Sequence, residues 1–325
     1  MASEPKTLQE ALIYFADPKN CREYLVARRW PNGVTCPRCG SDKVAFLEKY
    51  NRWQCSAKTH KDRQFTSKTG TIFEDSPLGL DKWLAAMWLL VNCKNGISSY
   101  EVSRDLKVSQ KSAWHMLHRI RLATQDKATG GKLSGEVEID ETFIGGKARN
   151  MHKGKREENI TGTGGKDKTA VMGMVERGGK VRLQVVDNRR KKELQKQVRE
   201  HVEAGAAIFT DELKSYDGLE SDYQHAVINH AVEYADGNVH TNTMENFWSL
   251  LKRGLHGTYI SVEPFHLFRY LDEQAFRYNN RKDNEGETLT DSDRFDLVVR
   301  QIVGKRLTWA EVTGKVKEIP PSSAN

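Results

Sequence analysis

The spacing of apolar side chains changes along the chain and separates a helical first part from a later part that contains strands. Before about residue 125, apolar residues recur every three or four positions, which predicts helices at 8–15, 21–29, 80–93, 97–106 and 111–124. From residue 136, short apolar runs predict strands at 136–144, 169–176, 180–187 and 206–210, with a weaker strand at 226–228. Further helices are expected at 191–202, 242–253 and 264–279.

This order of elements predicts a multidomain protein of the α+β or α/β class. Three strands, a helix, another strand and then helices match a ribonuclease-H-like core, which is a mixed sheet flanked by helices. The expected parts are an N-terminal helical segment (1–33), a zinc ribbon (34–75), a helix-turn-helix-like domain (76–127), the ribonuclease-H-like core (135–282) and a C-terminal tail (283–325). The insert at 147–167, rich in Gly and Lys, is expected to be mobile, and the end at 320–325 disordered.

Charge and composition favour a polyanionic partner inside the cell. The formal net charge is +7, which by itself supports only non-specific attraction to nucleic acid. The longest apolar run, from Trp83 to Val91, is shorter than the roughly 20 residues that cross a bilayer. The N-terminus has no signal-peptide pattern, and five cysteines do not suggest a disulfide framework. We therefore expect a cytoplasmic protein.

The cysteines near residue 40 have the spacing of a zinc site. Cys36 and Cys39 flank a tight turn that ends at Gly40, and Cys55 and His60 complete the pattern C-x2-C-x15-C-x4-H. Three cysteines and one histidine are an accepted tetrahedral set for Zn²⁺, and four protein ligands leave no open position for a substrate. The sequence therefore predicts a structural zinc ion, with Cys21 or a water molecule as the alternative fourth ligand.

Residues 97–124 have the pattern of a helix-turn-helix, with a short connection at 107–110. Such a second helix enters the major groove of DNA, where its basic residues contact phosphates and base edges. The side chains expected to be exposed for DNA binding are Lys111, His115, Arg119 and Arg121. The alternative is an ordinary helical hairpin with a solvated polar face.

Three carboxylates are the candidates for catalysis. Asp140 and Asp211 each follow a short apolar strand, and these strands would be neighbours in a ribonuclease-H-like sheet. Two adjacent carboxylates repel each other unless a cation lies between them. Oxygen ligands of this kind hold paired Mg²⁺ ions in enzymes that cut and rejoin phosphodiesters. We therefore expect Asp140 and Asp211 to hold divalent metal ions.

The third carboxylate, Glu245, lies near the start of a predicted helix. Steps of three and four residues place Glu245, Trp248 and Lys252 on one face of that helix, and Lys252 and Arg253 are positioned to contact DNA phosphates. Other candidates for the third ligand are Asn242, Asn246 and Glu273. Glu138 and Glu141, which flank Asp140, are expected to point to the opposite face of the sheet.

Several longer motifs resemble those of bacterial insertion-sequence transposases of the insertion-sequence 1595 type, which combine an N-terminal zinc ribbon with a DDE catalytic domain. The resemblance covers about residues 25–282. It is carried by Arg29–Gly33 with the Cys36/Cys39 turn, and by the segments 64–74, 139–147, 209–212, 240–253 and 276–281. One departure is His60, where a fourth cysteine is usual.

The resemblance implies that Asp140 and Asp211 are the first two catalytic acids and Glu245 the third, although Asn242 or Asn246 remains open for that role. It further implies two Mg²⁺ (or Mn²⁺) ions, cleavage of double-stranded DNA at the transposon ends, transfer of the freed ends to target DNA, and a homo-oligomer on DNA. A catalytically inert, sequence-specific DNA-binding regulator derived from a transposase is the alternative. A nuclease that cuts without joining is a third possibility.

Overall fold

The computed structural model describes residues 3–125, 131–146, 154, 168–228 and 240–316. The chain forms two compact units, one of residues 1–125 with 282–325 and one of residues 126–281. The insert predicted to be mobile, apart from Gly154, and the end predicted to be disordered lie outside the described residues. Within the described part of the chain, no helix has the length and apolar content needed to cross a membrane.

The first unit is helical, and its helices begin where short polar side chains cap them. Ser98 and Ser109 accept hydrogen bonds from backbone N–H groups at the start of their helices, and Asp17 does the same where Pro18 begins a helix. The helices are α1 (Leu8–Phe15), α2 (Pro18–Arg29), α3 (Leu80–Asn92), α4 (Ser99–Asp105), α5 (Gln110–Thr124), α10 (Asp291–Arg300) and α11 (Trp309–Val312).

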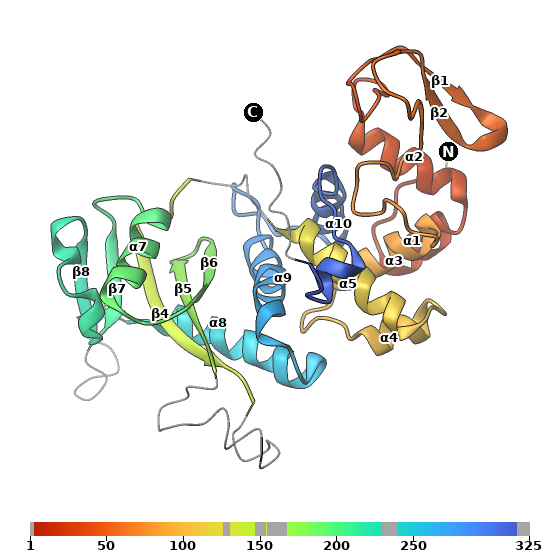
Figure 1. Cartoon of the computed structure of the whole chain (residues 1–325). Helices are drawn as coiled ribbons and strands as arrows, with labels where there is room; N and C mark the ends of the chain where they lie inside the picture. The colour runs from red at the N-terminus through yellow and green to blue at the C-terminus, as the bar shows by residue number, and fades with distance from the viewer. Residues whose placement is uncertain (1–2, 126–130, 147–153, 155–167, 229–239, 317–325) are drawn as a thin grey trace. The chain divides into compact units, whose positions relative to one another are not determined.

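The C-terminal segment completes the core of this first unit. The ring of Phe295 in α10 lies 5.7 Å from the ring of Phe15 and 5.0 Å from that of Trp88, between centroids. Asp296 pairs with Arg28 of α2 at 2.5 Å. Helices from both ends of the chain therefore share one hydrophobic core (Figure 1).

A small antiparallel sheet lies between α2 and α3 in the sequence. It consists of β1 (Val44–Leu47), β2 (Arg52–Cys55) and β3 (Gln64–Phe65), in that order, with a 3-10 turn at Glu48–Tyr50. Trp53 and Phe65 are stacked with 5.9 Å between ring centroids. Their shared face packs with Cys36 and Cys55 in one small core, so the sheet supports the cysteine pattern.

The second unit contains a five-stranded mixed sheet. Its strands are β4 (Glu136–Ile144), β5 (Thr169–Glu176), β6 (Val181–Val186), β7 (Ala207–Asp211) and β8 (Gln224–Ile228). They lie in the order β6-β5-β4-β7-β8. The first three strands are antiparallel, and β7 and β8 run parallel to β4. All five predicted strands are confirmed.

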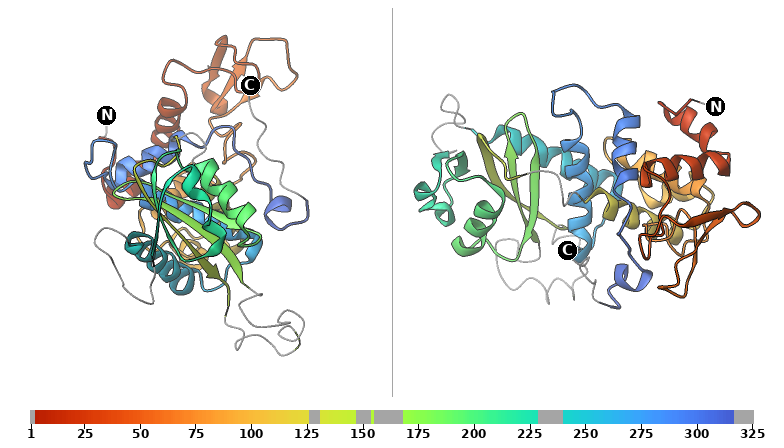
Figure 2. Two further views of the ribbon diagram at one scale, coloured as in Figure 1. Left: turned by 90° about the vertical axis from the view of Figure 1, so that its left-hand side faces the viewer. Right: turned by 90° about the horizontal axis from the view of Figure 1, so that it is seen from above.

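Helices cover both faces of this sheet (Figures 1 and 2). On one face, Leu194 and Val198 of α7 (Lys191–His201) share a core with Val137 and Ile139 of β4. The other face packs against α8 (Asn242–Arg253) and α9 (Leu267–Asn279). A π-helical segment (Gly254–Tyr259) and a 3-10 turn (Pro264–His266) connect α8 to α9, and further 3-10 turns cover Lys214–Tyr216 and Leu219–Ser221.

Two residues fix how closely the helices approach this sheet. A Cβ atom on Gly173 of β5 would lie 2.6 Å from the ring of Trp248, so only glycine permits α8 to pack so tightly here. The side-chain amide of Asn279, at the end of α9, bonds both the N–H of Val181 (2.7 Å) and its carbonyl oxygen (3.0 Å). Asn279 therefore attaches α9 to the outer strand β6.

Candidate metal centre and acid cluster

Four side chains of the zinc ribbon come together as the sequence predicts. The ligand atoms of Cys36, Cys39, Cys55 and His60, which we call the cysteine–histidine cluster, all lie within 4.8 Å of one another. The Cys39 and Cys55 sulfurs are 3.7 Å apart, and the Cys36 sulfur is 3.4 Å from Nε2 of His60. Zn–S bonds of about 2.3 Å in a tetrahedron give S···S separations of about 3.8 Å. The cluster therefore fits a structural zinc ion.

The backbone prepares these thiols to bind a metal. The N–H of Gly40, which has φ +72°, bonds the carbonyl of Cys36 and closes the turn. A backbone hydrogen bond from Ser41 lowers the pKa of Cys39 to about 6, which favours the thiolate that zinc requires. Cys21 is not part of the cluster, because it is buried in α2 and its thiol donates to the carbonyl of Phe15.

Asp140, in the middle of β4, and Asp211, the last residue of β7, lie on the same face of the second unit's sheet. In the parallel pairing of β4 with β7, Glu138 is opposite Phe209. Two residues further along each strand, Asp140 becomes level with Asp211, and residues at matched positions of parallel strands point to the same face. Both acids are partly buried. The two carboxylates therefore converge from neighbouring strands.

The side chain of Asp140 is held on both oxygens. The indole N–H of Trp248 in α8 donates to Oδ2 at 2.9 Å, and the backbone N–H of Glu141 donates to Oδ1 at 2.8 Å. Burial is the main cause of the raised pKa of Asp140, and the charges of Asp211 and Glu245 raise it further. Each carboxylate oxygen keeps a further lone pair for a cation. We call Asp140, Asp211 and Glu245 the acid cluster.

Glu245 is exposed in the first turn of α8, three residues before Trp248. Because Trp248 contacts Asp140 directly, α8 brings Glu245 to the same face of the sheet as Asp140. Asn242 and Asn246 are also exposed on α8. Glu273 is engaged elsewhere, since Tyr259 and Arg277 both donate hydrogen bonds to its Oε1.

Glu141 points to the opposite face of the sheet, as strand alternation predicts. It accepts a hydrogen bond from the hydroxyl of Tyr216, a residue of the core beside α7. Burial, followed by the charges of Asp211 and Asp140, raises the pKa of Glu141 to about 8. Metal-free protein near neutral pH therefore keeps a proton on Glu141, next to the acid cluster.

The expectation that Glu138 also points away from Asp140 is wrong. Residues two apart on a strand share a face, and Glu138 contacts the start of α8 through Thr243 and the N–H of Met244. Glu138 and Asp140 therefore both contact α8.

Comparison with known proteins assigns the chain to a family. A family model described as an ISXO2-like transposase domain matches residues 132–279, and a model described as a transposase zinc-ribbon domain matches residues 17–59. An uncharacterized transposase-like protein of Haemophilus influenzae is 34% identical over 102 residues, which are 31% of this chain and 82% of that protein. The chain belongs to the family of transposases of the insertion-sequence 1595 type.

Two further comparisons accompany this family assignment. An uncharacterized protein in the transposable element ISH50 of Halobacterium salinarum is 28% identical over 251 residues, which are 74% of this chain and 84% of that protein. A chain in the cryo-EM structure of a simian T-cell lymphotropic virus intasome has 15% identity and a TM-score of 0.28, and covers 66% of this chain and 69% of that chain. A TM-score this low supports no conclusion about the fold.

The helix expected to read DNA in this transposase-family protein is largely buried. Arg119 donates to the carbonyl of Glu74 at 2.5 Å and lies over the ring of Trp83, and Arg121 is also buried. A ring nitrogen of His115 lies 3.2 Å from the carbonyl oxygen of Leu307. The expected exposure of Arg119 and Arg121 is therefore wrong, and His115 is only partly exposed, because α3, α10 and α11 pack around α5. Lys111, in the first turn of α5, is exposed as predicted.

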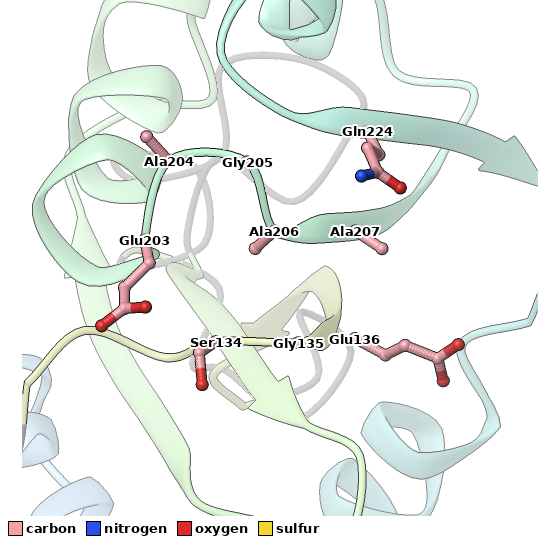
Figure 3. A pocket seen from close by; sticks show the side chains of 9 residues that line it. All are labelled: Ser134, Gly135, Glu136, Glu203, Ala204, Gly205, Ala206, Ala207 and Gln224. Carbon is pink, nitrogen blue, oxygen red and sulfur yellow. The ribbon is translucent and has the colours of Figure 1, made fainter.

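A shallow pocket lies where β4, β7 and β8 begin (Figure 3). Its lining comes from the residues that lead into β4 and β7, from Ser134 to Glu136 and from Glu203 to Ala207, and from Gln224 at the start of β8. Asp211 is the last residue of β7, and Asp140 lies in the middle of β4. The pocket therefore does not contain the candidate catalytic residues.

Some residues around the acid cluster were not predicted from the sequence. Arg177 bonds Glu138 and the carbonyl of His240, and Tyr216 bonds Glu141. Neither residue lies in a local motif that predicts such a contact. Gly173 did carry a signal, because a glycine within an otherwise apolar strand often marks a close approach by another element.

Proposed function

We propose that this protein binds the ends of an insertion sequence and catalyses divalent-metal-dependent cleavage and strand transfer of DNA. The observation that carries the proposal is the acid cluster. In a chain of a transposase family, three carboxylates from β4, β7 and α8 lie on one face of a mixed sheet. Burial and the neighbouring negative charges raise the pKa of Asp140, and a bound cation would offset both effects.

The topology of the second unit supports a ribonuclease-H-like core. Its sheet has three antiparallel strands followed by two strands parallel to the first of them, with helices on both faces. The end of β7, with Asp211, lies beside the middle of β4, with Asp140, and a substrate would approach the acids there. We also propose that the chain is divided into the parts 1–33, 34–75, 76–127, 135–282 and 283–325.

Asp140, Asp211 and Glu245 would hold two Mg²⁺ or Mn²⁺ ions. When bound, such ions activate a nucleophilic oxygen and stabilise the leaving 3′ oxygen of a phosphodiester. The N–H groups of Trp248 and Glu141 fix the orientation of the Asp140 carboxylate. The N–H of Leu213 donates to Oδ1 of Asp211 at 3.2 Å and orients the second carboxylate in the same way.

DNA contacts are proposed on exposed basic side chains. Lys252 is partly exposed and Arg253 exposed at the end of α8, the helix that carries Glu245. Lys111 is exposed at the start of α5. Cations at these positions bind phosphates without reading sequence. Recognition of the ends by the ribbon and assembly of a homo-oligomer on DNA are part of the same proposal.

The test is cleavage of a DNA fragment that carries the element's ends, by purified zinc-loaded protein with and without Mg²⁺. Asp140→Asn, Asp211→Asn and Glu245→Gln should each abolish cleavage and leave DNA binding intact. Glu200→Gln, at an exposed acid of α7, is the matched control and should cut normally. Asn242→Ala and Asn246→Ala determine whether an amide replaces Glu245 as the third ligand.

The outcomes separate the proposal from its alternatives. Sequence-specific DNA binding without any metal-dependent cleavage would refute the proposal in favour of an inert regulator. Cleavage without joining of a pre-cut 3′ end to target DNA would identify a nuclease. Wild-type cutting by one of the three acid variants would remove that residue from the site.

A further inference from the structure

A fully buried carboxylate lies next to the acid cluster without belonging to it. Glu138 has no exposed surface and lies two residues before Asp140 on the same face of β4. Burying a carboxylate is costly unless charged and hydrogen-bonding partners surround it. Its partners are Nε of Arg177 (2.8 Å), the hydroxyl of Thr243 (3.0 Å), the N–H of Met244 (3.0 Å) and, at 3.3 Å, Nδ1 of His240. Thr243 and Met244 belong to the first turn of α8, and His240 lies just before it.

Glu138 caps α8 from outside the helix. The residue at the N-cap position, Thr241, makes no side-chain capping hydrogen bond, and the N–H of Met244 would otherwise lack an intrahelical acceptor. The carboxylate of Glu138 supplies that acceptor from the neighbouring strand. A negative charge at this position also interacts favourably with the positive end of the helix dipole. The start of α8 is therefore fixed by the sheet rather than by its own sequence.

Arg177 connects this cap to the rest of the sheet. Besides Glu138, its guanidinium bonds the carboxylate of Glu136 (3.0 Å) and the carbonyl of His240 (2.8 Å) just before α8. It also lies 4.1 Å from the ring centroid of Phe209 in β7. Arg177 thus joins β4, β7 and the chain that leads into α8, which are the elements that carry the acid cluster.

Two hydrogen bonds join β4 to α8, and the distance between them along the strand is similar to the distance between them along the helix. Glu138 holds Met244, and Asp140 holds Trp248. Two residues of a strand advance about 6.8 Å, and four residues of a helix advance about 6 Å. The two hydrogen bonds therefore fix the position of α8 along β4, and Glu245 lies between them.

We propose that Glu138, held by Arg177, is a positioning residue that sets the place of Glu245 relative to Asp140 and so maintains the metal-binding arrangement. The inference rests on the proposed function, because it assigns a metal-holding role to the acid cluster. If Glu138 no longer holds Met244, α8 remains attached through Trp248 but its first turn is free to shift. Glu245 then moves relative to Asp140, and the affinity for metal falls before the fold is disrupted.

The experiment measures Mn²⁺ binding to the full-length, zinc-loaded protein by electron paramagnetic resonance, and the Mg²⁺ concentration that gives half-maximal DNA cleavage. Glu138→Gln keeps the size of the side chain but removes its charge. It should weaken Mn²⁺ binding and raise the half-maximal Mg²⁺ concentration by about tenfold, as loss of partners around metal ligands does elsewhere. Metal-free DNA binding should stay near wild type.

Glu136→Gln is the matched control. It also removes an ion pair with Arg177, but the Glu136 side chain is 42% exposed, whereas that of Glu138 is fully buried against α8. It should leave both metal measurements unchanged. Thr243→Val removes one donor to Glu138 and should shift both measurements in the same direction by a smaller factor. This variant decides the question if Glu138→Gln does not fold.

Unchanged metal dependence in folded Glu138→Gln, or in Thr243→Val if the first variant fails to fold, would overturn the inference. An equal shift in Glu136→Gln would also overturn it, because the effect would then reflect the charge of Arg177 alone. Failure of the proposed function gives a different result. Wild-type protein would then show no Mn²⁺ binding that depends on Asp140 and no metal-dependent cleavage.

Discussion

The cysteine–histidine cluster and the acid cluster gather their side chains in opposite ways. The first takes them from one short stretch, Cys36 to His60, and all four ligand atoms lie within 4.8 Å of one another. The second takes its carboxylates, the proposed ligands of Mg²⁺, from two strands and a helix between Asp140 and Glu245. Among the residues that the structure describes, no group of acidic side chains converges as the cysteine–histidine cluster does.

This difference reflects what each arrangement is suited to do. A complete ligand set excludes substrate and stabilises a fold, whereas a catalytic metal site keeps open positions. The ribbon is small, and its core of Trp53, Phe65 and the cysteines leaves much of the stability to the metal. The acids instead depend on a large, independently folded sheet, with Trp248, Leu213 and Glu138 as supports.

The largest effect is expected from removing a ligand of the cysteine–histidine cluster. Cys55→Ser should lower the zinc content, measured by mass spectrometry of the metal, from about one ion per chain to nearly none, since structural zinc contributes about 10–16 kcal/mol in small peptides. The ribbon should unfold while the second unit keeps its own melting transition. Cys93→Ser is the control and should retain zinc. Full zinc content in Cys55→Ser would contradict the ligand assignment.

A smaller but still large effect is expected where α8 meets the sheet. Gly173→Ala places a Cβ 2.6 Å from the ring of Trp248, so α8 must move away from β5. Overpacking of this kind costs about 1–3 kcal/mol, and a displacement near 1 Å lowers catalysis about 100-fold. Thermal melting and cleavage rates measure the two effects.

The control for this position is Gly257→Ala, whose added Cβ would meet nothing within 4 Å. It should leave melting and cleavage unchanged. Normal cleavage by Gly173→Ala would show that the acid cluster tolerates movement of α8. The acid cluster would then depend less on tertiary packing than we propose, and would differ less in this respect from the cysteine–histidine cluster.

A moderate effect is expected from Trp248→Phe. The change keeps an aromatic ring in the core but removes the N–H that donates to Asp140. Loss of such a partner of a metal ligand costs about tenfold in metal affinity. Titration of cleavage with Mg²⁺ measures it, with Trp309→Phe in the first unit as the control. An unchanged titration would mean that the hydrogen bond does not orient Asp140.

The smallest effect concerns pH. The pKa of Glu141 is raised to about 8, so between its ordinary pKa near 4.5 and pH 8 the folded state binds the proton more tightly than the unfolded state. Stability therefore falls as pH rises through this window. In metal-free protein, Glu141→Gln should lose this part of the pH dependence. Its melting temperature should exceed that of wild type by a few degrees at pH 8 and by less at pH 5.

Melting curves in a metal chelator at the two pH values measure this difference. Glu200→Gln is again the control, because it changes an exposed acid. Parallel curves for wild type and Glu141→Gln would contradict the raised pKa. Addition of Mg²⁺ should stabilise wild type more at pH 8 than at pH 5, since a cation held by Asp140 and Asp211 would offset the charge that Glu141 gains beside them.

The sequence predicted most elements and failed mainly on the surroundings of individual side chains. Apolar spacing located the five strands of the large sheet, and Ser98 and Ser109 begin their helices. The second helix of the helix-turn-helix pattern was also found, but Arg119 and Arg121 are buried rather than exposed. A helical period marks the apolar stripe that must be buried, and it does not tell how many other helices pack against the remaining faces.

The sequence by itself determined three members of the cysteine–histidine cluster, Cys36, Cys39 and Cys55, and favoured His60 as the fourth. It also determined the alternation that separates Asp140 from Glu141. Both depend on contacts between residues close in the chain, where the geometry of a turn or a strand leaves few options. Only the tertiary structure decided that Asp140 is level with Asp211, that Glu138 caps α8 and that Gly173 admits Trp248. These contacts join residues distant in sequence, and they form because strand pairing and helix packing bury apolar surface on both sides of one sheet.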